Sequence, residues 1–581
     1  MRIFYFYTIL MLSLWAAQAQ CPQYQDNLVE FISSSHYKDL NTIELEDNSH
    51  DFVIVGTKFT ESFTQETLFL VRINGSNGSI VWKKEFDQTH ASRGFDAVRY
   101  DENGQEYIAV TGYTNNGNLN EAYIAVVDAT NGTIVRENAF EIEPGFHSQG
   151  LHIIYTEKNY NGAPEPGFVV AGFYNFIYTV NVDDNGSGFL MRTDINLAPL
   201  WTRSSESSTT GLVDYDMMNR VTETSVGFFV TGSVNEPSGT RQSILLSKFD
   251  GDGNTLWTNS YVRGNFRDVG VDAYFESATG YIYVLVYYSD THYFGLTTID
   301  SSTGSILLNH SWSYVNGSEL NRTGFKISKN TDPSFPNDLV IFGYERDAII
   351  QDPTGPTVSA NTVPFTVSVN KTTGRISYAK SYPVPYKDNP DYQDYFRFWE
   401  GQSPLIFHPD MGFVSQGGSC SFMVANRSYG PNRSAIEMIA LTPSLQNTCD
   451  TTSFTATENL INLQLVPTTI NNKTIVAQAI SYSSQNIALE KTNCEQGTVL
   501  SVTTPHNKRP QLFPNPTNSV LNVNTTIKLG YRIFDVSGKQ IMQDDSVPDR
   551  GINLTSLQNG VYFIKFISED NKTETFKFIK Q

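Results

Sequence analysis

The residues with the clearest chemical potential lie in a short acidic loop, Asp250-Gly-Asp-Gly-Asn254. Aspartate and asparagine oxygens at alternating positions are how an EF-hand loop begins to coordinate calcium. Such a loop also needs a glutamate at its twelfth position, where this chain has Tyr261. The segment is followed closely by Trp257, as a hairpin turn between two strands would be. The sequence therefore favours a turn over a calcium site.

Motifs for other kinds of site are scarce. Nine histidines are scattered along the chain, and His147 and His152, five residues apart, lack a flanking zinc signature. The sequence contains no His-Glu-x-x-His, no Gly-x-Ser-x-Gly elbow and no phosphate-binding loop. We therefore predict neither a metal nor a cofactor, and we assign no catalytic residue.

One aromatic and acidic stretch, residues 386–399, is a candidate ligand site. It contains Tyr392, Tyr395 and Trp399, and it lies in the longest insertion of the repeat pattern described below. Aromatic rings can stack on a sugar, and nearby carboxylates can accept hydrogen bonds from its hydroxyl groups. The alternative is that these side chains belong to a strand and pack between repeats.

The N-terminus predicts export from the cytoplasm. Met1-Arg2 is followed by an apolar run and by Ala17-Gln18-Ala19, which is the pattern of a cleavable signal peptide over residues 1–19. The four cysteines, Cys21, Cys420, Cys449 and Cys494, then suit an oxidising compartment and two disulfides. Four cysteines allow three pairings. A Cys449–Cys494 bridge is economical, and Cys21–Cys420 would then tie the start of the mature chain to its last repeat.

Composition narrows the class of protein and of partner. Only 17% of the residues are charged, and turn-forming and aromatic residues are abundant, which favours β-structure. The formal net charge of −20 argues against a nucleic-acid partner, because phosphate binding depends on clustered Lys and Arg.

A repeat of about sixty residues extends from about residue 50 to 450. Each copy has an apolar strand that ends near a glycine, then a second strand, a turn and a third strand. The marker positions of the seven apolar strands are 56, 112, 172, 232, 286, 343 and 417. Small sheets of this size cannot bury both faces alone, so they must stack on copies of themselves. We expect a seven-bladed β-propeller over residues 20–449, with a strand around residues 40–45 completing the last blade.

The turn-strand unit in its fuller copies reads Asp-x-x-x-Gly-x-x-x-Trp, and Trp82, Trp201 and Trp257 stand at or near equivalent places. We expect these rings to pack between blades. The unit resembles the repeats of quinoprotein-like (PQQ-like) bacterial propellers. That resemblance implies the architecture and not the cofactor, because adjacent cysteines and quinone or calcium ligands are missing.

Beyond the repeats, residues 450–509 read as a β-rich connector and linker, with strands expected at 459–466 and 473–480. Residues 510–581 then alternate short strands and polar turns, which predicts a small Ig-like β-sandwich. Four motifs occur there in order: Pro-Asn-Pro at 514–516, Ile-Phe-Asp-Val-Ser-Gly at 533–538, Leu-Gln-Asn-Gly-Val-Tyr at 557–562, and a basic ending.

Together these four motifs closely resemble the type A C-terminal sorting domain of the type IX (Por) secretion system. The positions that match most plainly are Pro514, Asn515, Pro516, Gly538, Gly560 and Lys580. The resemblance implies that the type IX translocon carries the protein to the cell surface of a Gram-negative bacterium. It also implies that a sortase removes the domain, and that the cargo is attached to lipopolysaccharide or released.

For the exported portion we expect a binding or adhesion module that recognises a carbohydrate or a protein. The alternative is a polysaccharide hydrolase or lyase with acids in the central channel, and a structural component of the surface coat is a third option. Several carboxylates converging on one deep channel would favour the enzyme, and a shallow aromatic face would favour binding.

Overall fold

The computed structural model describes the chain in segments. These are residues 25–30, 35–45, 51–60, 65–75, 78–86, 91–115, 117, 119–158, 165–176, 186–205, 216–235, 242–262, 268–288, 293–314, 321–330, 332–346, 349–350, 358–359, 362–382, 411–415, 421–428, 434–441, 452–453, 456–460, 464–467, 471–473, 476–479, 484–485, 489–493, 511–513, 516–524, 529–536, 538–548, 551–568 and 573–581.

Within these segments the protein consists of strands and turns, and they contain no helix, so the all-β prediction is confirmed. Accordingly, no helix in the described ranges is long and apolar enough to cross a membrane. The chain divides into two compact units, residues 1–496 and residues 497–581, which are described separately.

The first unit contains seven five-stranded antiparallel sheets, here numbered 1 to 7. In sheets 1 to 6 four strands follow one another along the chain, and a fifth comes from residues 452–493. Sheet 1 contains β2 (Ser35–Glu44), β3 (Phe52–Thr60), β4 (Glu66–Ile73), β5 (Ile80–Phe86) and β36 (Ser484–Gln485). Sheet 2 contains β6 (Ser92–Glu102), β7 (Gln105–Asn115), β8 (Asn120–Asp128), β9 (Ile134–Glu141) and β35 (Val476–Ala479). Sheet 3 contains β10 (His147–Thr156), β11 (Gly167–Phe176), β12 (Ser187–Asp194), β13 (Pro199–Ser205) and β34 (Asn471–Lys473).

Sheet 4 contains β14 (Met217–Glu223), β15 (Gly227–Asn235), β16 (Gln242–Asp250), β17 (Thr255–Val262) and β33 (Gln464–Pro467). Sheet 5 contains β18 (Asp268–Glu276), β19 (Tyr281–Tyr288), β20 (Tyr293–Asp300), β21 (Ile306–Tyr314) and β32 (Ala456–Leu460). Sheet 6 contains β22 (Asn321–Lys329), β23 (Asp338–Arg346), β26 (Thr362–Asn370), β27 (Ile376–Ser381) and β31 (Thr452–Ser453), and a small hairpin, β24 (Ile349–Ile350) and β25 (Val358–Ser359), follows β23. Sheet 7 contains β28 (Met411–Ser415), β29 (Ser421–Ser428), β30 (Ser434–Leu441), β1 (Gln25–Glu30) and β37 (Leu489–Asn493).

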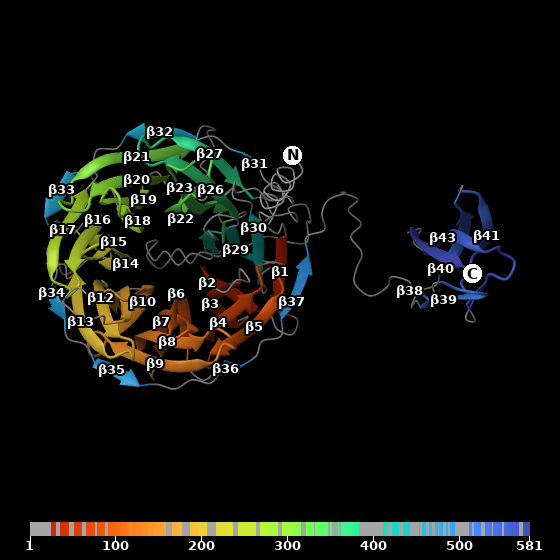
Figure 1. Ribbon diagram of the computed structural model, residues 1–581, viewed down its shortest axis with the longest axis horizontal. Coiled ribbons are helices and arrows are strands. Elements are labelled where there is room, and N and C mark those ends of the chain that lie inside the picture. The colour runs from red at the N-terminus through yellow and green to blue at the C-terminus, as the bar shows by residue number, and fades with distance from the viewer. Residues whose placement is uncertain are drawn as a thin grey trace, which may run out of the picture. The chain divides into compact units, whose positions relative to one another are not determined.

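The sheets follow one another around a ring, with the first strand of each sheet innermost (Figure 1). The innermost strands β6, β10, β14, β18 and β22 each contact strands of the preceding sheet, and β2 contacts sheet 7 in the same way. The hydrophobic clusters accordingly lie between neighbouring sheets; one of them joins Val53 and Leu70 of sheet 1 to Val110 and Tyr123 of sheet 2. Each apolar face is therefore buried against the next copy, as the repeat predicts.

Two details of the repeat prediction were wrong. The strand around residues 40–45 belongs to β2, which pairs with β3 in sheet 1, and β1 instead completes sheet 7 by pairing with β30. A short connection keeps β2 beside β3, which leaves the more distant β1 to join the C-terminal sheet. The seventh marker strand was also misplaced, because residues 411–415 form the first strand of sheet 7 and β29 is its second.

The connector was expected to contain two strands, and the structure shows seven short ones, β31 to β37. We use "the belt" for β31 to β37, residues 452–493. Each belt strand pairs antiparallel with the outermost strand of one sheet, and the order runs backwards from sheet 6 to sheet 1 before ending on sheet 7. The belt strands lie at the outer rim of the ring (Figure 1). The expected strands at 459–466 and 473–480 are wrong in extent. β32 ends at Leu460 and β33 begins at Gln464 in a different sheet, and β34 ends at Lys473 and β35 begins at Val476 in a different sheet.

A repeated clamp fixes three of the sheets to their neighbours. The indole N–H of Trp82 and the guanidinium of Arg72 both donate to the carbonyl oxygen of Ala129, a turn residue of the next sheet, at 2.8 and 3.0 Å. In sheet 3, Arg192 and Trp201 both donate to the carbonyl oxygen of Gly251. In sheet 4, Lys248 and Trp257 both donate to the carbonyl oxygen of Ser301. The expectation that the tryptophans pack between repeats is confirmed, and their N–H groups also satisfy turn carbonyls.

The clamp predicts an energetic coupling between Trp257 and Lys248. Trp257→Phe and Lys248→Met should each lower the free energy of unfolding by about 1 kcal/mol, because the Ser301 carbonyl keeps one donor in each variant. The double variant leaves that carbonyl without either donor, so its loss should exceed the sum by about 1 kcal/mol. Denaturant titration of the four proteins measures this term. Trp82→Phe combined with Lys248→Met is the control, and additivity in both pairs would contradict the clamp.

The second unit contains two antiparallel sheets around one core. One sheet contains β38 (Gln511–Phe513), β39 (Val520–Asn524) and β42 (Ile552–Asn553). The other contains β41 (Gln540–Asp544), β40 (Leu529–Asp535), β43 (Gly560–Ser568) and β44 (Thr573–Lys580). Buried side chains from both sheets, including Leu521, Ile533, Ile552, Ile564 and Phe578, form one hydrophobic cluster.

Candidate functional site

Six polar side chains from six different sheets gather at the centre of the ring. We call them the central ring residues: Asn41, Asp96, His152, Arg220, Asp272 and Lys326, in the order of sheets 1 to 6. Each lies on the innermost strand of its sheet and directly follows a shift in the pairing register with the second strand. A β-bulge re-aims the side chain next to it, so a bulge repeated once per sheet points equivalent residues at a common centre.

Glycines beside the bulges allow the innermost strands to approach the preceding sheet. A Cβ atom on Gly94 would lie 2.1 Å from Leu68 Cδ1, and one on Gly150 would lie 2.2 Å from Thr111 Oγ1. Gly270 has the same relation to Thr231 Oγ1, at 1.9 Å. A side chain at these positions would push the strands apart and separate the central ring residues.

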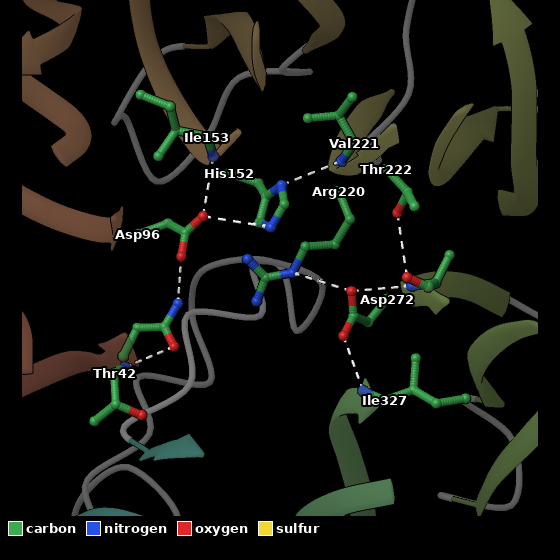
Figure 2. A network of polar contacts seen from close by, with 11 residues as sticks. Thr42, Asp96, His152, Ile153, Arg220, Val221, Thr222, Asp272 and Ile327 are labelled. Carbon is green, nitrogen blue, oxygen red and sulfur yellow. Dashed lines mark hydrogen bonds and ion pairs between the residues drawn. The ribbon is translucent and has the colours of Figure 1, made fainter. Parts of the chain in front are cut away.

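Asp96 is the most heavily bonded of the central ring residues (Figure 2). Its Oδ1 accepts a hydrogen bond from the Asn41 amide, and its Oδ2 accepts one from the backbone N–H of Ile153 at 2.9 Å. The same Oδ2 lies 3.4 Å from His152 Nε2. The carboxylate therefore joins sheets 1, 2 and 3. Burial raises its pKa, although the positive charge of Arg220 and the backbone hydrogen bonds act in the other direction.

The hydrogen bonds of His152 define its tautomer. Nδ1 accepts the backbone N–H of Val221 at 3.3 Å, so the single proton of the neutral ring lies on Nε2, facing Asp96. Burial lowers the pKa of this histidine well below 6.5, and the positive charges of Arg220 and Lys326 lower it further. A neutral imidazole with both nitrogens engaged has no lone pair available to act as a general base.

Asp272 repeats the role of Asp96 on the opposite side of the centre (Figure 2). Its Oδ2 accepts the backbone N–H of Ile327 at 2.9 Å, and its Oδ1 accepts the backbone N–H of the following residue, Ala273, at 2.9 Å. Arg220 Nε lies 3.9 Å from the same Oδ1. Burial raises the pKa of Asp272, and the charge of Arg220 opposes that rise. Burial likewise lowers the pKa of Lys326, against the attraction of both aspartates.

One rule connects these contacts. Three of the central ring side chains accept the backbone N–H that follows the equivalent residue of the next sheet: Asp96 from Ile153, His152 from Val221, and Asp272 from Ile327. Arg220 has no acceptor atom and cannot do this. Most polar atoms at the centre therefore hold neighbouring sheets together, and what remains for a ligand is a set of donors on Arg220 and Lys326.

Sequence reasoning missed this site, although a signal was present. The innermost strands read Gly-Phe-Asp-Ala at 94–97, Gly-Leu-His-Ile at 150–153, Gly-Val-Asp-Ala at 270–273 and Gly-Phe-Lys-Ile at 324–327. A glycine, an apolar residue, a charged residue or histidine, and an apolar residue thus recur in four of the seven sheets. Because the charged residue changes sign between copies, a search for one conserved residue type does not find it.

The buried neutral histidine predicts a pH dependence of stability. An unfolded histidine binds a proton below about pH 6.5, while folded His152 does not, so stability is present above that pH and is lost as the pH falls below it. The loss should approach 1.4 kcal/mol per pH unit, at most, between pH 6.5 and pH 5. His152→Gln should lack this slope. The raised pKa of Asp96 contributes a pH dependence of stability with the opposite sign, and this contribution is present in both the wild type and His152→Gln.

Urea titrations at several pH values measure this difference. His147→Gln is the matched control on the same strand, because burial lowers the pKa of His147 less strongly; its Nδ1 accepts the backbone N–H of Asn120 at 2.9 Å. Parallel curves for the wild type and His152→Gln between pH 6.5 and pH 5 would contradict the prediction.

The acidic loop is a turn, as the sequence favoured. Asp250 Oδ1 accepts the backbone N–H groups of Asp252 and Asn254, at 3.0 and 2.7 Å, and its Oδ2 accepts the Asn254 side-chain amide. The loop joins β16 to β17 and presents Gly251 to the Trp201 clamp. In the described part of the chain, no group of three or more His, Cys, Asp or Glu residues is placed to hold a metal ion.

Several predicted site residues lie outside the described residues. These are the aromatic candidates Tyr392, Tyr395 and Trp399, the cysteines Cys21, Cys420, Cys449 and Cys494, the motif residues Pro514 and Asn515, and the signal peptide at 1–19. The ligand-site and disulfide predictions therefore stay predictions.

The C-terminal motifs come together at one end of the second unit. Gly560 is the cross-strand partner of Lys580, and the backbone N–H of Thr517, directly after Pro516, donates to the carbonyl of Ile579 at 2.9 Å. Gly538 has a φ of +82°, which suits glycine, in the turn after β40. That turn follows Asp535, which pairs with Tyr562 of β43. Segments from four places in the sequence therefore lie at the same end of the four-stranded sheet.

The family model described as a secretion system C-terminal sorting domain covers this region. Residues 511–581 match the sorting domain. The resemblance inferred from the four motifs is thereby confirmed. The sorting domain marks proteins that type IX secretion exports, so the chain is exported to the cell surface or the extracellular space and interacts with the type IX secretion machinery.

Two solved structures show a distant likeness to this chain. A mutant apocarotenoid oxygenase from Synechocystis is 10% identical, with a TM-score of 0.33, over 77% of this chain and 97% of its own. The extracellular domain of a one component system from B. thetaiotaomicron is 10% identical, with a TM-score of 0.18, over 93% of this chain and 80% of its own. These TM-scores are too low to carry an argument. No curated protein matches the sequence.

Proposed function

We propose that the exported chain is a seven-bladed β-propeller that binds an extracellular carbohydrate or protein. Seven sheets of equivalent topology support the blade count, and the pairing of β1 with β30 supports closure of the ring by joining the N-terminal strand to the C-terminal sheet. The second unit is an Ig-like sandwich in this proposal. A sortase then removes it, and the propeller is attached to lipopolysaccharide or released.

The observation that carries the binding function is the state of the polar groups at the centre. The oxygens of Asp96 and Asp272 accept backbone N–H groups, and both nitrogens of His152 are engaged. Catalytic acids and bases must exchange protons with a substrate, whereas these groups are committed to the scaffold. A rigid polar centre with donors to spare supports recognition of a ligand without its cleavage.

The alternative function is a polysaccharide hydrolase or lyase, and one observation favours it. Two carboxylates, Asp96 and Asp272, lie on opposite sides of the centre, and burial raises the pKa of both, as a general acid requires. The hydrogen bonds just described weigh against this role, because an acid must present a proton to the leaving group. Binding therefore remains the preferred proposal.

A polysaccharide panel distinguishes the two functions. The purified full-length protein is incubated with neutral and acidic polysaccharides, and both retention and the appearance of new reducing ends are measured. Retention without new reducing ends is expected. New reducing ends that disappear in Asp96→Asn or Asp272→Asn, with the protein still folded, would establish the enzyme instead.

The aromatic stretch is a second candidate contact for the same ligand. We propose that Tyr392, Tyr395 and Trp399 stack on a sugar, since aromatic residues with neighbouring carboxylates suit this chemistry. Alanine at the three positions should abolish carbohydrate retention and leave thermal stability unchanged. A fall in stability with retention preserved would assign these residues to packing.

A further inference from the structure

Two cations at the centre of the ring have donor groups that the protein does not use. Arg220 is paired through Nε, 3.9 Å from Asp272 Oδ1, and no described residue accepts a hydrogen bond from its two terminal nitrogens. Figure 2 shows these nitrogens on the side of the guanidinium away from Asp272. Lys326, on the next sheet but one, makes neither a hydrogen bond nor an ion pair within the described residues, and it interacts with Asp96, Asp272 and Arg220 through charge alone.

The acids nearby attract both cations, but within the described residues Arg220 Nε makes the one ion-pair contact between these acids and the two cations. Asp96 already has three donors around it, from Asn41, Ile153 and His152. Asp272 has two backbone N–H groups in addition to Arg220 Nε. The side chain of Arg220 is 12% exposed, and its terminal nitrogens are not fully buried, so solvent and a small ligand can reach them. An acidic ligand that replaced this water would form charge-assisted hydrogen bonds with the two nitrogens.

We infer that Arg220 and Lys326 together bind one acidic group, a carboxylate or a sulfate, of an otherwise neutral saccharide. The planar guanidinium offers two parallel N–H donors that match the two oxygens of such a group, and the ammonium adds a second charge. This inference rests on the binding function proposed above and names the chemical class of its ligand.

The surroundings favour a sugar with a single acidic group. All six central ring residues are polar, and a polar lining suits sugar hydroxyls better than the apolar core of a protein interface does. The formal charge of the whole chain is −20, which disfavours a polyanion. Salt screens that repulsion beyond about 10 Å at 0.1 M, so the local cations decide the binding of one small acidic group.

Calorimetric titration of the full-length protein tests the site with four matched sugars. D-galacturonate carries the carboxylate, its methyl ester removes only the charge, galactose 6-sulfate carries a sulfate, and galactose is neutral. We expect galacturonate, or the sulfate, to bind at least about tenfold more tightly than the ester and galactose. Preference between the two acidic sugars then identifies the acidic group.

Variants connect that preference to the two cations. Arg220→Gln and Lys326→Gln should each weaken binding of the acidic sugar by about tenfold and leave the neutral sugars unaffected. Lys329→Gln, an exposed position on the same strand as Lys326, should bind as the wild type does. If Arg220→Gln lowers the melting temperature through the loss of its ion pair, Lys326→Gln carries the test alone.

The outcomes separate this inference from the proposed function. Equal affinity for galacturonate, its ester and galactose overturns the acidic-group inference and leaves carbohydrate binding standing. Wild-type affinity for the acidic sugar in both Gln variants likewise overturns it. Absence of binding to all four sugars at millimolar concentration contradicts the inference, while the polysaccharide panel then decides the proposed function independently.

Discussion

Deletion of residues 511–581 should abolish delivery to the cell surface while leaving the ring folded. The sorting domain is the part of the chain that the type IX machinery recognises, and it is a compact unit separate from residues 1–496. The buried side chains of the domain's hydrophobic cluster all come from the domain itself, so we expect the ring to fold without it. Surface protein measured by protease accessibility in intact cells should fall to background, with the truncated chain retained inside the cell envelope.

Two further variants sharpen this result. Gly538→Val places a branched side chain at a φ of +82°, which costs about 1–3 kcal/mol and should reduce export through misfolding of the turn. Arg220→Gln, in the ring, should be exported as efficiently as the wild type. Surface exposure of the truncated chain at wild-type level would refute the sorting role of residues 511–581.

Deletion of the belt, residues 452–493, should destabilise the ring and cause it to self-associate. Without the belt, the outermost strand of every sheet presents unpaired backbone N–H and C=O groups to solvent. Unpaired edges are templates for pairing with other chains. Net stabilisation by a hydrogen bond is about 1 kcal/mol, and the belt pairs with all seven sheets, so we expect a loss of several kcal/mol and a melting temperature lower by several degrees.

Light scattering and thermal melts of the exported protein measure both effects. A deletion of residues 497–510, which lie between the belt and the sorting domain, is the matched control and should leave the melting temperature unchanged. A monomeric belt deletion with a wild-type melting temperature would show that the outer edges need no cover.

The sequence predicted the elements that repeat with one residue type and missed those that repeat only in geometry. The glycine-ended apolar strands and the tryptophan turns recur as identical residues, so the sheets and the inter-sheet role of Trp82, Trp201 and Trp257 could be predicted. The central ring residues occupy equivalent positions with different chemistry, because each contacts a different neighbour. These residues come together only when the sheets close into a ring, and a pattern within one repeat cannot predict that closure.

The belt escaped prediction for a related reason. Its strands are two to five residues long, too short to show an alternating pattern. They exist because the sheet edges precede them in the chain and offer partners, so their structure is determined by tertiary pairing and not by local preference. The N-terminal strand shows the same effect, since β1 is defined by pairing with β30 and β37, both far away in sequence.

The position of the belt in the chain also sets the timing of maturation. Ribosomes make the seven sheets first, the belt next and the sorting domain last, because synthesis proceeds from the N-terminus. The sorting domain is therefore complete only after the belt, which pairs with the outermost strand of every sheet, has been made. A chain truncated before residue 452 lacks both the belt and the sorting domain. Such an incomplete and association-prone chain therefore carries no signal that the type IX machinery recognises.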